Sequence, residues 1–179
     1  MSMRKVIRLS LAVVISAFSF LFFESAALAA VVSVDAVSAQ SADIYDMVML
    51  SKINSYREAN GVPALEYNED LIDVANYRIG ELVVNFDHTR PNGESYKTVY
   101  AELGLTDKYE RGSENIAKIL ADWDFENENG DEYVDYIFEA YKNSDRHNEN
   151  MLKPYWKYYG GSFLTNYNGS CYQIQVFAK

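Results

Sequence analysis

The chain has 179 residues, of which 49% are hydrophobic and 23% charged, so it can bury one globular core and is too short for two. Its formal net charge of −10 argues against nucleic acid and anionic membrane surfaces as partners, because like charges repel. The single cysteine, Cys171, excludes an internal disulfide, and we expect it to be a buried structural thiol.

The N-terminus has the three-part pattern of a secretory signal peptide. Three basic residues among the first eight precede an uncharged run over residues 9–23, and Ala27 and Ala29 follow in A-x-A spacing. The uncharged run is shorter than the roughly 20 residues that a membrane span needs. An uncleaved membrane anchor is the alternative, since apolar residues resume after Glu24.

We therefore expect cleavage after Ala29 and a secreted, extracellular protein whose mature form has no integral membrane segment. The predicted organisation is a signal peptide over residues 1–29, a flexible lead-in over residues 30–43 and a single domain over residues 44–179.

Two amphipathic helices are predicted at the start of the domain. The first begins at Ser41, which can cap it, and ends at the Asn60-Gly61 pair, with apolar residues at helical spacing between them. The second begins near the capping residue Asn68, and its apolar stripe consists of Leu71, Ile72, Ala75, Ile79 and Leu82.

The middle of the chain is predicted to be rich in loops. The segment "FDHTRPNGES" (residues 86–95) contains a Pro-Asn-Gly turn signal and is expected to be a loop, with a short helix over residues 94–103. The segment "SENIAKIL" (residues 113–120) alternates weakly, which favours a short strand. A further helix is predicted over residues 131–143, where apolar residues recur on one face.

The last third of the chain is predicted to end in a hairpin. The segment "NSDRHNENML" (residues 143–152) is interpreted as a helix end followed by a turn, with its final Met-Leu pair tied to the core. Two strands, over residues 156–167 and 171–178, flank an Asn-Gly pair, which is a strong hairpin signal. Helices first and strands later, without a βαβ rhythm, predict an α+β fold with an antiparallel sheet.

Five segments, in order, resemble motifs of the CAP superfamily, which comprises cysteine-rich secretory proteins, antigen 5 and plant pathogenesis-related class 1 proteins. The resemblance is to the bacterial SCP-like extracellular branch and covers roughly residues 45–179. The segments are "LSKINSYREANGVPALEYNEDLIDVA", "FDHTRPNG", "GSENIA", "EAYKNSDRHNENML" and "YYGGSF".

The resemblance implies a three-layer α-β-α sandwich with a central antiparallel sheet. It also implies a cleft in which His88, Glu114 and His147 converge. In the eukaryotic branch a fourth, acidic residue stands three positions after a tryptophan. In this chain Tyr141 replaces that tryptophan and Ser144 occupies the acidic position, so the full set of two histidines and two carboxylates is not reproduced.

The residue types support two kinds of chemistry at such a cleft. Two imidazoles and one carboxylate, from His88, His147 and Glu114, form a mixed N/O set suited to Zn²⁺ or another divalent cation, with an open position for water or substrate. Alternatively, one histidine acts as a general base oriented by Glu114, with Ser144 as the nucleophile. The competing interpretation gives these residues structural roles. The histidines would then lie on the surface, Glu114 and Asn115 would hold a loop by hydrogen bonds, and Ser144 would cap a helix.

We therefore expect a secreted CAP-domain protein whose cleft, formed by His88, Glu114, His147 and Ser144, binds an extracellular peptide, lipid, or matrix or host component, with or without a divalent cation. A secreted hydrolase, either metal-dependent or based on a Ser/His pair, is the alternative function.

Overall fold

The computed structural model describes residues 44–120, 130–166 and 169–179. These residues lie in one compact unit, residues 42–179. The predicted signal peptide and lead-in, residues 1–29 and 30–43, lie outside the described residues, as does the predicted helix cap Ser41. None of the helices in the described part combines the length and the apolar character that crossing a bilayer requires.

A four-stranded mixed sheet forms the centre of the unit. Its strands run in the order β1-β3-β4-β2, with β3 antiparallel to β4 and β4 antiparallel to β2. The three long strands confirm the predicted central antiparallel sheet, and the short β1 adds a parallel pair with β3 at its edge. The strands are β1 (Glu66–Tyr67), β2 (Gly112–Ile119), β3 (Tyr158–Thr165) and β4 (Cys171–Ala178).

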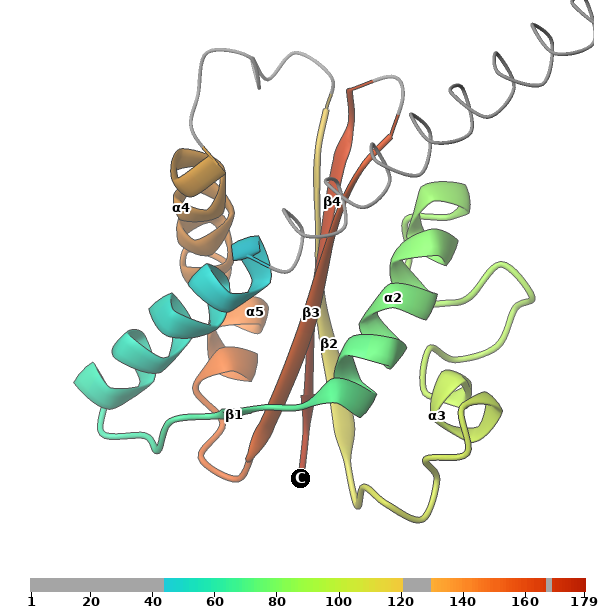
Figure 1. Cartoon of the computed structure of the whole chain (residues 1–179), viewed down its shortest axis with the longest axis horizontal. Helices are drawn as coiled ribbons and strands as arrows, with labels where there is room; N and C mark the ends of the chain where they lie inside the picture. Colours follow the sequence, from blue (N-terminus) through green and yellow to red (C-terminus); the bar gives the residue numbers. More distant parts are fainter. Residues whose placement is uncertain (1–43, 121–129, 167–168) are drawn as a thin grey trace, which may run out of the picture. The chain divides into compact units, whose positions relative to one another are not determined.

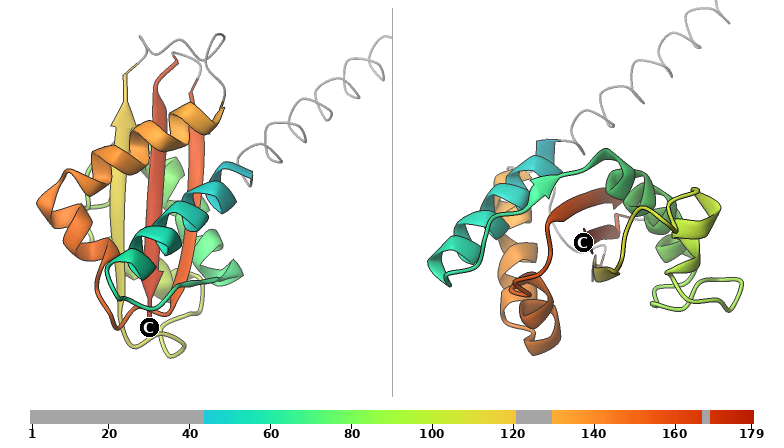
Figure 2. Two further views of the ribbon diagram at one scale, coloured as in Figure 1. Left: turned by 90° about the vertical axis from the view of Figure 1, so that its left-hand side faces the viewer. Right: turned by 90° about the horizontal axis from the view of Figure 1, so that it is seen from below.

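Helices cover both faces of the sheet, which confirms the three-layer α-β-α sandwich. In Figure 1, α2 and α3 lie on one side of the sheet, and α4, α5 and the helix over residues 44–59 lie on the other. Figure 2 shows the 44–59 helix and α4 crossing the same face of the strands. The named helices are α2 (Glu69–Val84), α3 (Thr98–Glu102), α4 (Gly130–Lys142) and α5 (Asp145–Met151).

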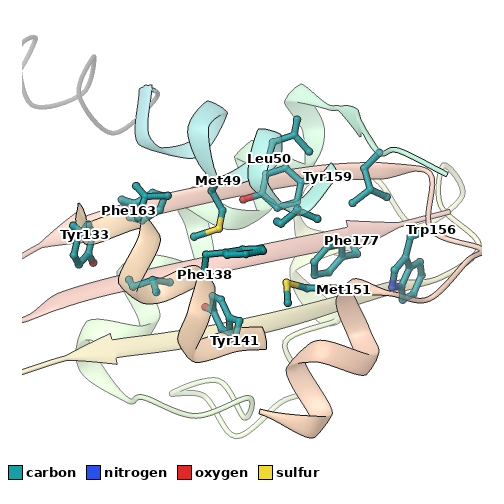
Figure 3. Close-up of a cluster of buried hydrophobic side chains, with 14 of the residues drawn as sticks. Met49, Leu50, Tyr133, Phe138, Tyr141, Met151, Trp156, Tyr159, Phe163 and Phe177 are labelled. Atoms are coloured by element: carbon teal, nitrogen blue, oxygen red, sulfur yellow. The ribbon is translucent and has the colours of Figure 1, made fainter. Parts of the chain in front are cut away.

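Each face of the sheet packs against its own hydrophobic cluster. Figure 3 shows the cluster between the sheet and the helices 44–59, α4 and α5, where Met49, Phe138 and Phe177 meet. The cluster on the opposite face joins α2 to alternate residues of β4, namely Tyr172, Ile174, Val176 and Ala178. Because β4 is covered on both faces, all eight of its residues are buried, including the predicted structural thiol of Cys171.

Local signals place α2 against β3. The Asn68 side chain accepts a hydrogen bond from the Leu71 amide at 3.1 Å, as predicted for an N-cap. Gly160 of β3 lies under this first turn, where a Cβ atom would overlap the Leu71 backbone. The absence of a side chain at this position therefore lets the helix backbone approach the strand closely.

Two buried charges tie the 44–59 helix to the end of the chain. Asp46, 2% exposed, accepts hydrogen bonds from the Tyr159 hydroxyl at 2.7 Å and from the Gly161 amide at 3.2 Å. Arg57 is fully buried, and its guanidinium donates to four backbone carbonyls, those of Pro63, Met151, Lys153 and Trp156. Neither charge could be stably buried without these partners.

The segment 143–152 differs from its prediction. It was interpreted as a helix end followed by a turn, but most of it forms α5, with Ser144 at the N-cap position in an extended conformation. Met151 is fully buried as predicted, whereas Leu152 is only half-buried. His147 therefore projects from a short helix that is anchored at its end in the core.

Candidate functional site

Glu114 is held inside the protein by a buried arginine. It lies on β2 with its side chain 1% exposed, and Arg78 from α2 is fully buried beside it. Arg78 Nε donates to Glu114 Oε2 at 3.0 Å and Arg78 Nη2 donates to Glu114 Oε1 at 2.9 Å. This bidentate pair fixes the carboxylate and neutralises its charge.

Arg78 has further acceptors, which keep its own charge in place. Its Nη1 donates to Glu81 Oε2 at 2.6 Å, and its Nη2 donates to the Asp87 carbonyl at 3.0 Å. Burial alone would lower the pKa of Arg78, but the hydrogen bonds and negative charges of Glu114 and Glu81 outweigh it and raise that pKa. The guanidinium is therefore a permanent cation beneath the site.

His88 lies on the loop after α2 and meets the same carboxylate. Its Nδ1 is 3.0 Å from Glu114 Oε1, and its side chain is 53% exposed. Because a carboxylate held by arginine can only accept, Nδ1 carries the proton of this hydrogen bond. In neutral His88, Nε2 is therefore the free acceptor of the ring.

His147 approaches from the opposite side, on α5. It is half-buried, and its ring lies edge-on to Tyr141 with the two centroids 5.1 Å apart. Burial lowers the pKa of His147, and the charge of a protonated His88 lowers it further. The shared site of the two histidines stays a prediction.

A second buried arginine fixes the loop that carries His88. Arg90 is 3% exposed and connects the loop to α2 and α3. Its Nε donates to Glu81 Oε1 of α2 at 2.9 Å, and its Nη1 donates to Glu102 Oε1 of α3 at 2.5 Å. Hydrogen bonds from Arg90 and from the Tyr77 hydroxyl lower the pKa of Glu102 to about 2. Alternating charges therefore run from Arg90 through Glu81 and Arg78 to the site.

An amide network joins α5 to the sheet. Asn115 on β2 donates from Nδ2 to the His147 carbonyl at 3.2 Å and to Gln175 Oε1 at 2.9 Å. Its Oδ1 accepts from Asn150 Nδ2 at 2.9 Å. Asn115 is thus a structural fastener, although it acts from a strand and not from the loop that was expected.

Comparison with known proteins gives the family. A model of the cysteine-rich secretory protein family, CAP, matches residues 50–177. The chain belongs to the CAP family. A comparison with curated proteins finds no match.

Three solved structures share the CAP fold with this chain. An outer surface protein from Borrelia burgdorferi is 19% identical with a TM-score of 0.59, and the match covers 74% of this chain and 90% of that one. An extracellular protein containing an SCP domain from Bacillus anthracis is 17% identical with a TM-score of 0.61, covering 77% and 41%. A cysteine-rich secretory protein from Staphylococcus aureus is 20% identical with a TM-score of 0.54, covering 76% and 38%. The chain thus spans about two fifths of the length of the last two proteins.

Ser144 makes neither of the hydrogen bonds that its two predicted roles would use. It stands at the N-cap of α5, but its side chain makes no capping hydrogen bond. Among the described residues its hydroxyl also makes no hydrogen bond to His88 or His147, which activation as a nucleophile would require.

The donor set does not fit a divalent cation in this arrangement. Both oxygens of Glu114 already accept hydrogen bonds from Arg78, and one also meets His88. A cation bound to this carboxylate would also lie next to the positive charge of the guanidinium, which repels it. Among the described residues, no three His, Cys, Asp or Glu side chains are grouped to hold a metal ion. Arg78, Glu114 and His88 are therefore better described as a charge-neutralised hydrogen-bonding group.

Proposed function

We propose that this CAP domain is an exported binding protein that recognises an extracellular peptide, lipid, or matrix or host component at the His88–Glu114–His147 site. One observation carries the proposal: Arg78 already holds both oxygens of Glu114. The carboxylate is thereby fixed as a support for His88, whose exposed ring edge is left to meet a ligand. Because the support is pre-organised, little ordering has to occur on binding.

Export is part of the same proposal. It is supported by the signal-peptide pattern of residues 1–29 and by the printed descriptions of the similar structures, one an outer surface protein and another an extracellular protein. Mass spectrometry of the protein recovered from the medium of an expressing bacterium tests it. A mature N-terminus at Ala30 is expected, and retention of the intact leader in the cell membrane would contradict it.

Binding is tested at the histidines themselves. The chain has only two, so labelling histidine rings gives one reporter signal from His88 and one from His147. A panel of unstructured peptides, phosphatidylcholine vesicles and purified matrix proteins is added in turn. We expect at least one member to shift both signals without being chemically altered, and His88→Ala to abolish its binding. The exposed loop residue Asn92 supplies the control, since Asn92→Ala should bind normally.

The hydrolase is the second candidate, and the 3.0 Å contact between His88 Nδ1 and Glu114 Oε1 favours it. A carboxylate that orients Nδ1 leaves Nε2 to take a proton from water. If a panel member were cleaved by the native protein and not by His88→Ala, the hydrolase would replace the binding function. If no member shifted either histidine signal, the binding proposal would be overturned.

A further inference from the structure

A hollow of about 600 Å³ lies next to the histidine site but does not include either histidine. Residues around α3, the first residues of β2 and the segment before β3 line it. One lining residue, Tyr96, also meets the His88 ring, with the two centroids 6.0 Å apart. Its volume lies within the roughly 300–1,000 Å³ that small-molecule sites occupy. We call this hollow the tyrosine pocket, after the residues that form its walls.

The walls of the tyrosine pocket are flat aromatic rings, several of which are fixed. Trp156 is 4% exposed, and its indole N–H donates to the Asn150 carbonyl at 3.1 Å. Tyr155 is 37% exposed and lies edge-on to Trp156, with ring centroids 4.6 Å apart. The other aromatic residues of the wall are Tyr96, Tyr100 and Tyr109.

Tyr100, one of the wall residues, packs closely against Gly112. A Cβ atom at Gly112 would lie 2.5 Å from the Tyr100 hydroxyl oxygen, so only glycine leaves room for the ring. That hydroxyl is buried and has no hydrogen-bond partner among the described residues. The pocket thus offers a preformed apolar surface with rigid walls, which suits a flat apolar group.

The rim of the pocket is positively charged although the protein is acidic. Lys97, Arg111 and Lys153 line it, and Glu110 is the acidic residue among the lining residues. Glu110 is itself paired with Lys179 at 3.0 Å and with Arg111 at 3.6 Å. Neither Lys97 nor Lys153 forms an ion pair within the described part of the chain.

Lys153 donates to Asn150 Oδ1 at 3.5 Å and Lys97 lies over the Tyr96 ring, so neither ammonium charge is offset by a carboxylate among the described residues. Two such cations at one hollow are informative in a chain with 26 acidic and 16 basic residues. Most surface positions of such a protein repel anions, whereas this rim attracts them. Arg111, which pairs with Glu110, stacks over the Tyr155 ring at 5.7 Å from guanidinium carbon to centroid. Charge and apolar surface therefore meet at the same opening.

We propose that the tyrosine pocket is a second ligand site that binds a small amphipathic anion, one with a flat apolar body and a single carboxylate. The body packs against the exposed part of the Tyr155 ring, which the buried Trp156 ring supports, and the carboxylate pairs with the ammonium groups of Lys97 and Lys153. The volume admits a small molecule and not a folded partner. This site is independent of the proposed binding function at His88.

The test uses two nearly isosteric probes, indole-3-acetate and indole-3-acetamide, which differ in charge. Calorimetry with the native protein should give saturable binding of the acetate and binding of the amide that is at least about tenfold weaker, equivalent to about 1.4 kcal/mol. Lys97→Gln and Lys153→Gln should each weaken acetate binding several-fold and leave the amide unchanged. Tyr155→Ala should weaken both probes, since it removes the apolar contact.

Matched controls separate this site from others. Lys118 also lies over a tyrosine ring, that of Tyr172 at 5.1 Å, but it is outside the pocket, so Lys118→Gln should bind both probes normally. The inference is overturned if neither probe binds with a dissociation constant below about 1 mM, which corresponds to a binding free energy of about −4 kcal/mol. It is also overturned if the two probes bind with equal affinity, or if the Lys97 and Lys153 variants bind the acetate as tightly as Lys118→Gln does. None of these outcomes bears on the histidine-site proposal.

Discussion

Replacing Arg78 by methionine tests whether the buried ion pair is the support of the site. The substitution keeps the length and apolar stem of the side chain but leaves Glu114, with its side chain 1% exposed, facing only His88. Removing one partner of a buried pair typically costs about 3–5 kcal/mol, because the remaining charge loses its compensation. Since domains of this kind have about 5–15 kcal/mol of stability in total, Arg78→Met should be close to the folding threshold.

The measurement is urea unfolding followed by circular dichroism at pH 7.5, with the slope of the transition compared between variants. The double variant Arg78→Met/Glu114→Leu removes both charges and should recover most of the loss, because an apolar pair of similar volume can replace a buried ion pair. Exposed Arg146 provides the control, and Arg146→Met should change stability by less than about 0.5 kcal/mol. A loss below about 1 kcal/mol for Arg78→Met, or a double variant as unstable as the single one, would refute the reasoning.

Four further outcomes are expected. Gly160→Ala should lower the free energy of unfolding by about 1–3 kcal/mol, because the new methyl group overlaps the backbone of α2. Gly80→Ala, within α2 itself, places its methyl group in open space and should not lower the free energy of unfolding. Equal effects of the two substitutions would contradict the close-approach argument. Ser144→Ala should change stability by less than about 0.5 kcal/mol, since no capping bond is lost; a loss near 1 kcal/mol would restore the capping role. Burial lowers the pKa of His147 in the folded protein, so on acidification the unfolded chain binds a proton at this histidine before the folded one does. The free energy of unfolding should therefore fall as the pH drops below about 6.5. His147→Gln should remove this part of the pH profile, and an unchanged profile would argue against the role of His147. Calorimetry with ZnCl₂ should show no stoichiometric binding, and Zn²⁺ binding that His88→Ala abolished would reinstate the metal site.

Local sequence signals predicted the elements that local physics controls. The N-cap at Asn68, the stop at Asn60-Gly61 and the two C-terminal strands were read from turn, capping and alternation patterns, and the structure confirms them. The two-residue β1 was missed because it exists only through pairing with β3. The seven-residue α5 was taken as a turn, since so short and polar a segment shows no periodicity.

The site was only partly predictable, for a related reason. The resemblance to the CAP family pointed to His88, Glu114 and His147, but it gave no indication of the arginine that holds Glu114. A signal was nevertheless present, because Arg78 continues the apolar stripe of α2 at the spacing set by Leu71 and Ala75. A lone cation on a buried stripe needs an acidic partner across the interface, and only the tertiary structure identifies that partner.

The contacts of Asp46 and Arg57 also set an order of events in folding. Their acceptors and donors lie 94 to 115 residues later in the chain, at Met151, Tyr159 and Gly161. A chain emerging N-terminus first cannot bury these two charges until its last strands have been made, so its opening helix must dock late. For a protein that we propose is exported, late docking has a use: a polypeptide still awaiting its C-terminal strands remains loosely folded, and so threadable, while it leaves the cell.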